Sequence, residues 1–145
     1  MVDIILTDLA ARLETDAVRA LLLAFGYPAV SAAAQADRIT AEYHHHPQQP
    51  ILGAEHDDEL LGLIGLRLET QHTGIIRHIV VHPAWRRHGV SWATICAIRE
   101  RFGLHTLIAE TDWDAVDFYR RCGFAVEGLG EIYPGTERFR CVLSR

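Results

Sequence analysis

Six consecutive residues, Arg86 to Ser91 (RRHGVS), bring positive charge, a glycine and a hydroxyl group together between a predicted strand and a predicted helix. A loop that enters a helix presents several unpaired backbone N–H groups at one point, and the helix dipole adds partial positive charge there. A diphosphate binds such a site with little help from side chains. Gly89 lets the backbone approach a ligand closely, while Arg87 and His88 add local charge. The segment predicts a phosphate-binding loop, with a solvated surface turn as the alternative.

A second segment lies downstream, Glu110 to Phe124 (ETDWDAVDFYRRCGF), in which a predicted strand leads into a predicted helix. The two segments together resemble the GNAT family of acyl-CoA-dependent N-acetyltransferases, in order and spacing, over roughly residues 60 to 125. The first resembles the family's acyl-CoA motif, Q/R-x-x-G-x-G/A. The second is similar to its strand–helix segment ending in A-x-x-F-Y-x-x-x-G-F, which this chain matches at Ala115, Phe118, Tyr119, Gly123 and Phe124.

The resemblance implies a fold and a cofactor site. The implied fold is α/β, with a mixed, mostly antiparallel central sheet, a parallel strand–helix–strand crossover and flanking helices. Acetyl-CoA is the implied co-substrate, and the loop amides of Arg87, His88, Gly89, Val90 and Ser91 would bind its pyrophosphate. Arg86 is a further implied cofactor contact. The strand edge at Ile79, Val80 and Val81 would pair with pantetheine, as an added strand would, where that strand separates from the next parallel strand. The remaining implied cofactor contacts are Asp112, Phe118 and Tyr119.

The implied reaction is the attack of an amine on a thioester, so the departing thiolate needs a proton or a strong hydrogen bond. We expect Tyr119 to be this acid, because a phenol with a reference pKa near ~10 is protonated at neutral pH. Its counterpart in the family often contacts the sulfur of the cofactor. A core tyrosine with a satisfied hydroxyl is the alternative.

An alkyl amine with a pKa near ~10.4 is almost entirely protonated at pH 7, so a proton acceptor is expected as well. Glu110, at the end of the predicted fourth strand, and His78, inside the third, both lie near the predicted cleft. Glu69 and His72 are more distant candidates. Ordered water, which the family frequently uses, is the alternative to a direct base.

The chain departs from the family pattern at two positions. Ser91 stands where the family has Gly or Ala, and its small side chain preserves the close approach of the backbone. Asp112 stands where many members have Asn, and a carboxylate cannot donate a hydrogen bond to pantetheine as an amide can. Helix capping is an adequate role for Asp112.

The elements that would position these residues follow from the spacing of apolar residues. Residues 8–25 and 30–43 predict two helices joined at Gly26-Tyr27-Pro28, and the Pro-broken stretch 43–50 predicts a loop. Three strands are then expected over 51–55, 60–68 and 75–81. The last is apolar except at Arg77 and His78, which favours a strand covered on both faces.

The second half of the chain alternates helices and strands. A helix over 90–102 is expected to end at the C-cap Gly103, and a strand follows over 104–110. Thr111 and Asp114 form a capping-box signature for the next helix, which ends just before Gly123. The final prediction is a hairpin that turns at Pro134-Gly135, with strands over 124–132 and 137–143.

The composition limits the classes of function. A chain of 145 residues predicts one domain, residues 1–145, and its net charge of −5 argues against binding to nucleic acid or to an anionic membrane. Cys96, Cys122 and Cys141 form no CxxC pattern, which favours reduced thiols and a cytoplasmic protein. No targeting pattern is visible, and the longest apolar run, Ala20 to Phe25, is too short to cross a bilayer.

Other conspicuous residues favour ordinary structural roles. The run His44-His45-His46 predicts no metal site, because three adjacent side chains on a regular element cannot all face one ion. Trp85, Trp92 and Trp113 flank the predicted cofactor site and could stack on adenine, although partial packing on the surface is the favoured interpretation.

The acceptor stays open between a small molecule and a peptide amine. The segment from Tyr27 to Tyr43 and the hairpin from Glu131 to Arg140, with Tyr133 and Arg138, are expected to line its site. A homodimer also stays open. The alternative functions are a non-catalytic acyl-CoA sensor or interaction module, and a nucleotide-phosphate binder, which lacks the GK[ST] ending it would need.

Overall fold

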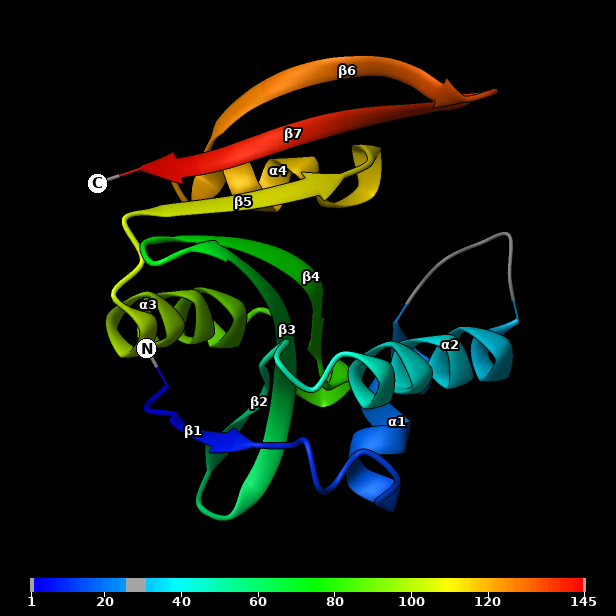
Figure 1. Cartoon of the computed structure of the whole chain (residues 1–145), viewed down its shortest axis with the longest axis vertical. Coiled ribbons are helices and arrows are strands. Elements are labelled where there is room, and N and C mark those ends of the chain that lie inside the picture. The colour runs from blue at the N-terminus through cyan, green and yellow to red at the C-terminus, as the bar shows by residue number, and fades with distance from the viewer. Residues whose placement is uncertain (1, 26–30, 145) are drawn as a thin grey trace.

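A single mixed sheet runs through the computed structural model, which describes residues 2–25 and 31–144. Its strand order is β1-β2-β3-β4-β5-β7-β6 (Figure 1). The strands are β1 (Ile5–Asp8), β2 (Ile51–His56), β3 (Glu59–Thr70), β4 (Thr73–Val81), β5 (Thr106–Thr111), β6 (Ala125–Tyr133) and β7 (Thr136–Ser144). The helices are α1 (Asp16–Ala24), α2 (Ala32–His45), α3 (Val90–Phe102) and α4 (Trp113–Arg121), with a 3₁₀ turn at Pro83–Trp85.

Only one pair of neighbouring strands is parallel among the described residues, namely β4 and β5. The chain passes between them through α3, which makes the strand–helix–strand crossover. The predicted fold class, a mostly antiparallel mixed sheet with one such crossover, is confirmed.

Helices cover both faces of the sheet. Helices α3 and α4 pack on one face through a core that includes Ile95, Ile98 and Val116. Helices α1 and α2 pack on the other face through a second core, in which Leu21 and Leu22 of α1 lie with Leu63 and Val80 of the sheet. Figure 1 shows α1 and α2 beside the half of the sheet that contains β1 to β4, whereas α4 lies against β5, β6 and β7.

The prediction for the first 25 residues was wrong in its boundaries. Residues 5–8 form an edge strand, β1, and α1 begins only at Asp16 instead of residue 8. Leu9 and Leu13 are spaced like residues of a helix but reach the core from an irregular segment, in which the Leu9 N–H donates to the Ile51 carbonyl. These two leucines are apolar because they are buried in the tertiary structure, and their helix-like spacing is not a sign of a helix.

The predicted loop 43–50 was also partly wrong, because α2 continues through His45. His46 ends the helix with non-helical backbone just before Pro47, since a proline disfavours helical backbone in the residue before it. Strands β3 and β4 are longer than predicted, and β5 begins at Thr106 instead of residue 104. The predicted turn at residues 26–28 lies outside the described residues.

The start of α4 differs from the predicted capping box. Thr111 is the last residue of β5, and the N-cap is Asp112, whose carboxylate accepts a hydrogen bond from the Asp114 N–H at 3.0 Å. A carboxylate at the N-cap satisfies a free N–H and complements the helix dipole, so it replaces the threonine in this role. The C-caps agree better with the sequence, since Gly103 and Gly123 both have left-handed backbone after their helices.

Candidate functional site

The loop before α3 exposes its backbone N–H groups. Arg87 and Gly89 both have left-handed backbone, with φ angles of 66° and 77°, and the His88 ring donates through Nδ1–H to the Arg86 carbonyl at 2.9 Å. The N–H groups of residues 87–92 donate to no carbonyl of residues 2–25 or 31–144. A Cβ atom built on Gly89 would meet no described atom within 4 Å beyond its two chain neighbours. The loop therefore turns unpaired donors and the positive end of the α3 dipole toward open space.

Strands β4 and β5 separate next to this loop. Their parallel pairing runs from Thr73 with Thr106 to Ile76 with Ala109 and ends there. Residues 77–81 of β4 continue beside β3 but have no partner on β5, and this stretch includes the predicted pantetheine edge, Ile79, Val80 and Val81. The predicted separation of the two parallel strands is confirmed. Free backbone groups on a separating strand can accept an amide-bearing ligand like an added strand.

A β-bulge in β4 lies where the two strands separate. Gly65 of β3 pairs with His78, while the next residue, Leu66, pairs with Ile76, so Arg77 is the extra residue. A bulge turns two consecutive side chains toward one face and bends the strand. Arg77 and His78 therefore both reach α2, although neighbours in a regular strand point to opposite faces.

His78 contacts α2 through a buried hydrogen bond. Its Nδ1 lies 2.8 Å from the Tyr43 hydroxyl, and its ring also makes an edge contact with Phe25. The hydroxyl of Tyr43 lies directly over Gly65, where any side chain on β3 would collide with it. A glycine in a strand interior is typical of such a close approach, and here it gives the tyrosine its path to the imidazole.

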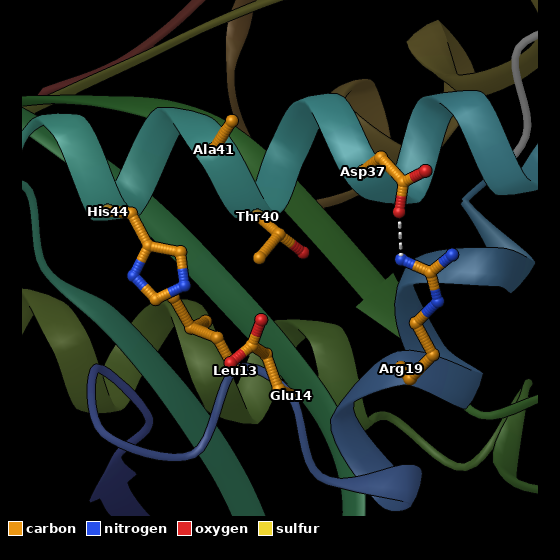
Figure 2. Close-up of a pocket in the computed structure, with 7 residues that line it drawn as sticks. All are labelled: Leu13, Glu14, Arg19, Asp37, Thr40, Ala41 and His44. Carbon is orange, nitrogen blue, oxygen red and sulfur yellow. Dashed lines mark hydrogen bonds and ion pairs between the residues drawn. The ribbon is translucent and has the colours of Figure 1, made fainter.

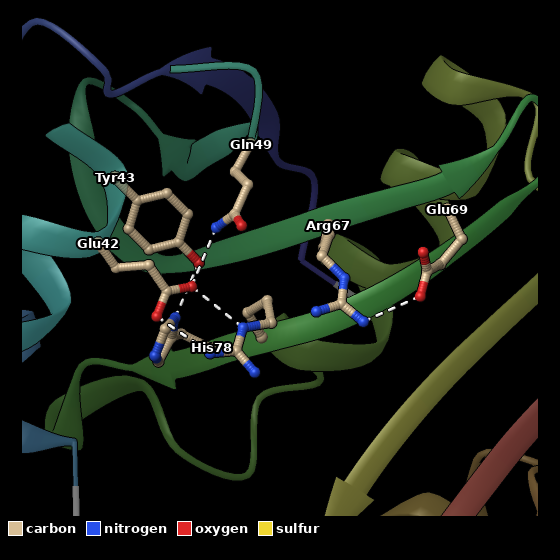
Figure 3. Close-up of polar contacts among 7 residues, drawn as sticks. Glu42, Tyr43, Gln49, Arg67, Glu69 and His78 are labelled. Carbon is tan, nitrogen blue, oxygen red and sulfur yellow. Dashed lines mark hydrogen bonds and ion pairs between the residues drawn. The ribbon is translucent and has the colours of Figure 1, made fainter. Parts of the chain in front are cut away.

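Arg77 contacts α2 through a two-pronged ion pair. Its Nε and Nη2 donate to the two carboxylate oxygens of Glu42 at 3.0 and 3.1 Å. Gln49 donates to the same carboxylate at 2.9 Å (Figure 3). Residues 42 and 43 of α2 thus bind residues 77 and 78 of β4, one pair by charge and one by a neutral hydrogen bond.

The protonation states of this cluster follow from its surroundings. Burial lowers the pKa of His78 to about 4, with the nearby Arg77 charge acting in the same direction and Glu42 opposing it. Burial raises the pKa of Tyr43 far above its ordinary value. Hydrogen bonds from Arg77 and Gln49 outweigh burial at Glu42 and lower its pKa. At neutral pH, His78 and Tyr43 are therefore uncharged and Glu42 is an anion.

Tyr119 belongs to the same core cluster as Ile76 and Ala109, the last paired residues of β4 and β5. It is buried on α4 against Phe118 and Phe124, whose rings stand edge-on to it at centroid distances of 5.1 Å. Its hydroxyl forms no hydrogen bond with the described residues, and burial raises its pKa above the ordinary value, helped by the thiols of Cys141 and Cys122. The phenol is therefore protonated at neutral pH.

Of the predicted bases, Glu110 lies on β5 and His78 lies on β4, the two strands that separate. Glu110 is exposed near the end of β5, and its charge contributes to a raised pKa at Arg77 of the bulge. His72 lies at the other end of the β4–β5 pairing, where it stacks on His105 and donates to the Gly103 carbonyl. Glu69 is exposed on β3 in an ion pair with Arg67. The structure therefore brings Glu110 and His78 near the gap and leaves His72 away from it.

The remaining predicted residues are distributed around the same loop. Trp85 donates to Glu59 and makes an edge contact with His88, Trp92 packs on the core, and Trp113 is 60% exposed. Glu131 is exposed on β6 and Arg138 is half-buried on β7, while Tyr27 and the side chain of Tyr133 lie outside the described part of the chain. Of the three adjacent histidines at residues 44–46, His44 and His46 line different pockets.

Two pockets flank α2. One, of about 510 Å³, lies between α2 and the segment around α1, where Arg19 and Asp37 form an ion pair of 2.7 Å (Figure 2). The other, of about 520 Å³, lies beside the bulge and is lined by Arg77 and Glu42 among others. Within residues 2–25 and 31–144, no three His, Cys, Asp or Glu side chains are arranged to hold a metal ion. No described helix has the length and apolar character needed to cross a membrane.

Sequence reasoning missed the α2 contribution to this site. Glu42 and Tyr43 lie 35 residues before their partners on β4, and nothing in their local sequence indicates that contact. Gly65 was the available signal, because a glycine within a predicted apolar strand suggests close approach of another group.

Comparison with known proteins supports the fold. The model of the acetyltransferase (GNAT) family matches residues 15–124, whereas no curated protein sequence matches the chain. A GNAT-family acetyltransferase from Desulfovibrio desulfuricans has 22% identity and a TM-score of 0.75 over 98% of this chain and 99% of that one.

Two further solved structures carry cofactor. An aminoglycoside 6'-N-acetyltransferase complexed with coenzyme A has 14% identity and a TM-score of 0.74, over 97% of this chain and 96% of that one. An acetyltransferase from Elizabethkingia anophelis with acetyl-CoA bound has 15% identity and a TM-score of 0.68, over 98% of both chains. At these identities the likeness shows a shared fold.

Proposed function

The chain belongs to the GNAT family of acetyltransferases, and from this membership we propose that it moves the acetyl group of acetyl-CoA to an amine. Acetyl-CoA supplies an activated thioester to the site. The relatives with coenzyme A or acetyl-CoA bound have the same fold over nearly the whole chain, which supports acetyl-CoA as the co-substrate.

The observation that carries the proposal is the set of unpaired N–H groups at residues 87–92. Protein carbonyls of the described residues leave these donors free, and open space lies in front of Gly89. A diphosphate fits such a cradle through backbone donors and the helix dipole. Arg86 and Arg87 are exposed beside it and add positive charge to a chain whose net charge is −5.

The free edge of β4 supports the placement of the pantetheine arm. Residues 77–81 offer backbone groups in the gap that opens after Ile76 and Ala109. A pantetheine chain bound along this edge would extend from the α3 loop toward the bulge. The thioester would then lie between the bulge on β4 and Tyr119 below the sheet.

We assign the acid to Tyr119 and the base to Glu110. Tyr119 keeps its proton at neutral pH, and its hydroxyl has no partner among the described residues, so it can donate to a departing thiolate. His78 is a weak base because its pKa is about 4, and its Nδ1 is already bonded to Tyr43. Glu110 is exposed at the gap and can take the proton of the amine through water.

The experiment is calorimetric titration with coenzyme A, followed by thioester turnover with a panel of amines. We expect Tyr119→Phe to lower kcat by about 100-fold while coenzyme A affinity stays within a factor of about two. Equal losses of affinity and turnover would remove the acid role from Tyr119. Neither binding nor turnover in the wild-type protein would overturn the proposed function.

A non-catalytic acyl-CoA sensor is the second candidate, and the burial of the Tyr119 side chain, which is only 4% exposed, favours it. A tyrosine whose pKa is raised by burial is a weaker acid toward a thiolate than an ordinary one. This candidate predicts tight coenzyme A binding without turnover on any amine, so the same two measurements separate it from the enzyme.

A further inference from the structure

The pocket beside the bulge is the part of the molecule whose chemistry the proposed function leaves undefined. It has a volume of about 520 Å³ and adjoins the gap at Arg77. Its lining comes from the end of α2, the loop after it, β3 and β4, and comprises Glu42, His46, Gln48, Gln49, Arg67, Leu68, Glu69 and Arg77. An acceptor that reaches the thioester from the α2 side of the sheet would lie here.

The first charged pair in the lining is already saturated. Glu42 receives two hydrogen bonds from Arg77 and a third from Gln49. The carboxylate is about four-fifths buried, since its side chain is 21% exposed. Because the charges and hydrogen-bonding groups of Arg77 and Glu42 already satisfy each other, this side of the pocket has little capacity to bind a substrate charge.

The second charged pair is different. Arg67 donates from Nη2 alone to Glu69 at 2.9 Å, and the two side chains are 48% and 43% exposed. An exposed pair of this kind is weak and easily rearranged. Nε and Nη1 of Arg67 form no hydrogen bond with residues 2–25 or 31–144, so the guanidinium keeps a free set of donors at the pocket. A guanidinium with free donors can bind a carboxylate through two parallel hydrogen bonds.

The balance of charge narrows the acceptor class. Outside the saturated Arg77–Glu42 pair, the charged lining residues are Arg67 and Glu69, so a polyamine would be repelled by Arg67 and a dianion would be repelled by Glu69. We propose that the acceptor is an amine that also carries a carboxylate, in the class of free amino acids, and that Arg67 binds this carboxylate. The inference rests on the proposed acetyl transfer, because it concerns the acceptor of that reaction.

The strand register supports the orientation of such a molecule. Arg67 pairs with Ile75 of β4, and Ile75 pairs with Ile108 of β5, so these three residues share one face of the sheet. Glu110 is two residues beyond Ile108 and points to that same face. A carboxylate bound at Arg67 therefore directs the rest of the acceptor across the face toward Glu110 and the gap, where the amine would lose its proton.

The test compares matched acceptors. The twenty standard L-amino acids are assayed for thioester turnover beside their methyl esters and the amines that lack the carboxyl group. We expect at least one amino acid to exceed both of its counterparts by about tenfold or more in kcat/KM. Arg67→Ala should raise KM for that amino acid and reduce its advantage to about onefold, with kcat nearly unchanged.

Arg12→Ala is the matched control. Arg12 also makes a single 2.9 Å ion pair, with Glu55, and its side chain is 47% exposed, but it lies near β1, away from the pocket. This variant should keep the full preference for the amino acid. An unchanged preference in Arg67→Ala, or a loss in both variants, would overturn the assignment of Arg67.

The possible outcomes distinguish failure of the amino-acid acceptor from failure of the proposed acetyl transfer. Turnover of esters and simple amines without preference for the amino acids overturns the acceptor class and leaves acetyl transfer standing. Binding of coenzyme A without turnover of any of the three kinds of acceptor overturns the acceptor class together with catalysis. Absence of coenzyme A binding overturns the cofactor site as well.

Discussion

The two sides of the gap between β4 and β5 are built in different ways. The loop before α3 is built from backbone groups, since left-handed residues and a helix start turn consecutive N–H groups in one direction. The cluster at the β4 bulge is built from side-chain contacts between α2, β3 and β4, which contribute Tyr43, Gly65 and His78. The loop depends on local conformation, and the cluster depends on long-range packing. Substitutions should therefore affect cofactor binding at the loop and stability at the cluster.

The largest expected effect tests the loop. Gly89→Trp places a large side chain in the open space before the free N–H groups, so coenzyme A affinity should fall about a thousandfold, or about 4 kcal/mol. Isothermal titration calorimetry measures this loss.

Gly103→Trp is the control for Gly89→Trp, because Gly103 ends the same helix with left-handed backbone and equally open surroundings. Both variants should lose about 1–2 kcal/mol of stability from backbone strain, whereas only the first should lose cofactor. Equal affinity in the two variants would separate the loop from cofactor binding.

The next effect concerns the cluster and pH. His78 has a pKa of about 4 in the folded chain against 6.5 when unperturbed, so the unfolded chain binds more protons between these values. The stability that neutral His78 contributes is complete above about pH 6.5. It is lost as pH falls through this window, about 1 kcal/mol by pH 5.5 and about 3 kcal/mol by pH 4.

Urea unfolding of the wild type and of His78→Asn at pH 7.5 and 5.5 measures this contribution. The asparagine can still bond to Tyr43 but does not titrate, so its stability should change less over that interval. The interval stays above the range in which Glu42, whose pKa is lowered, takes up a proton. The same slope in both proteins would show that His78 is not the titrating group.

A smaller effect is expected at Gly65. Gly65→Ala forces its new methyl group against the Tyr43 hydroxyl and should cost about 1–3 kcal/mol, as overpacking does. Gly128→Ala is the control, because the nearest atom to its new carbon lies 3.6 Å away. Coenzyme A affinity should not change in either variant. A neutral Gly65→Ala in urea unfolding would mean that Tyr43 moves freely and does not hold the imidazole.

The smallest expected effect is that of Arg77→Lys. An ammonium cannot make the two-pronged contact with Glu42, but the Arg77 side chain is 41% exposed, so the loss should be under about 1 kcal/mol. Urea unfolding at neutral pH checks it. A loss above about 2 kcal/mol would show that the pair, and not the hydrogen bond of His78, is the main contact between α2 and β4.

Much of the second half of the chain was predictable because its signals are local. Gly103 follows the last apolar residue of a helical stripe, and Gly123 follows two arginines in a last turn, so both C-caps were found. The first 50 residues were predicted less well. Leu9 and Leu13 are buried by tertiary contacts, and β1 is too short to show strand alternation.

The candidate site divides in the same way. The α3 loop was identified from RRHGVS, since a glycine before an apolar helix produces the observed backbone without help from elsewhere. The pairing of Glu42 with Arg77 and of Tyr43 with His78 was not predicted. No periodicity connects residues 35 positions apart, and the bulge that turns Arg77 and His78 the same way depends on how β4 pairs with β3.

The sequence by itself determined the helix ends at Gly103 and Gly123, the crossover between β4 and β5 and the glycine-containing loop before α3, because these depend on backbone preferences of nearby residues. Tertiary structure decided the position of the bulge, the depressed pKa of His78 and the pocket that contains Arg67. The bulge depends on how β4 pairs with β3, and the pKa and the pocket depend on which side chains α2 brings against the sheet. Desolvation and close contact arise only when segments distant in the chain pack together.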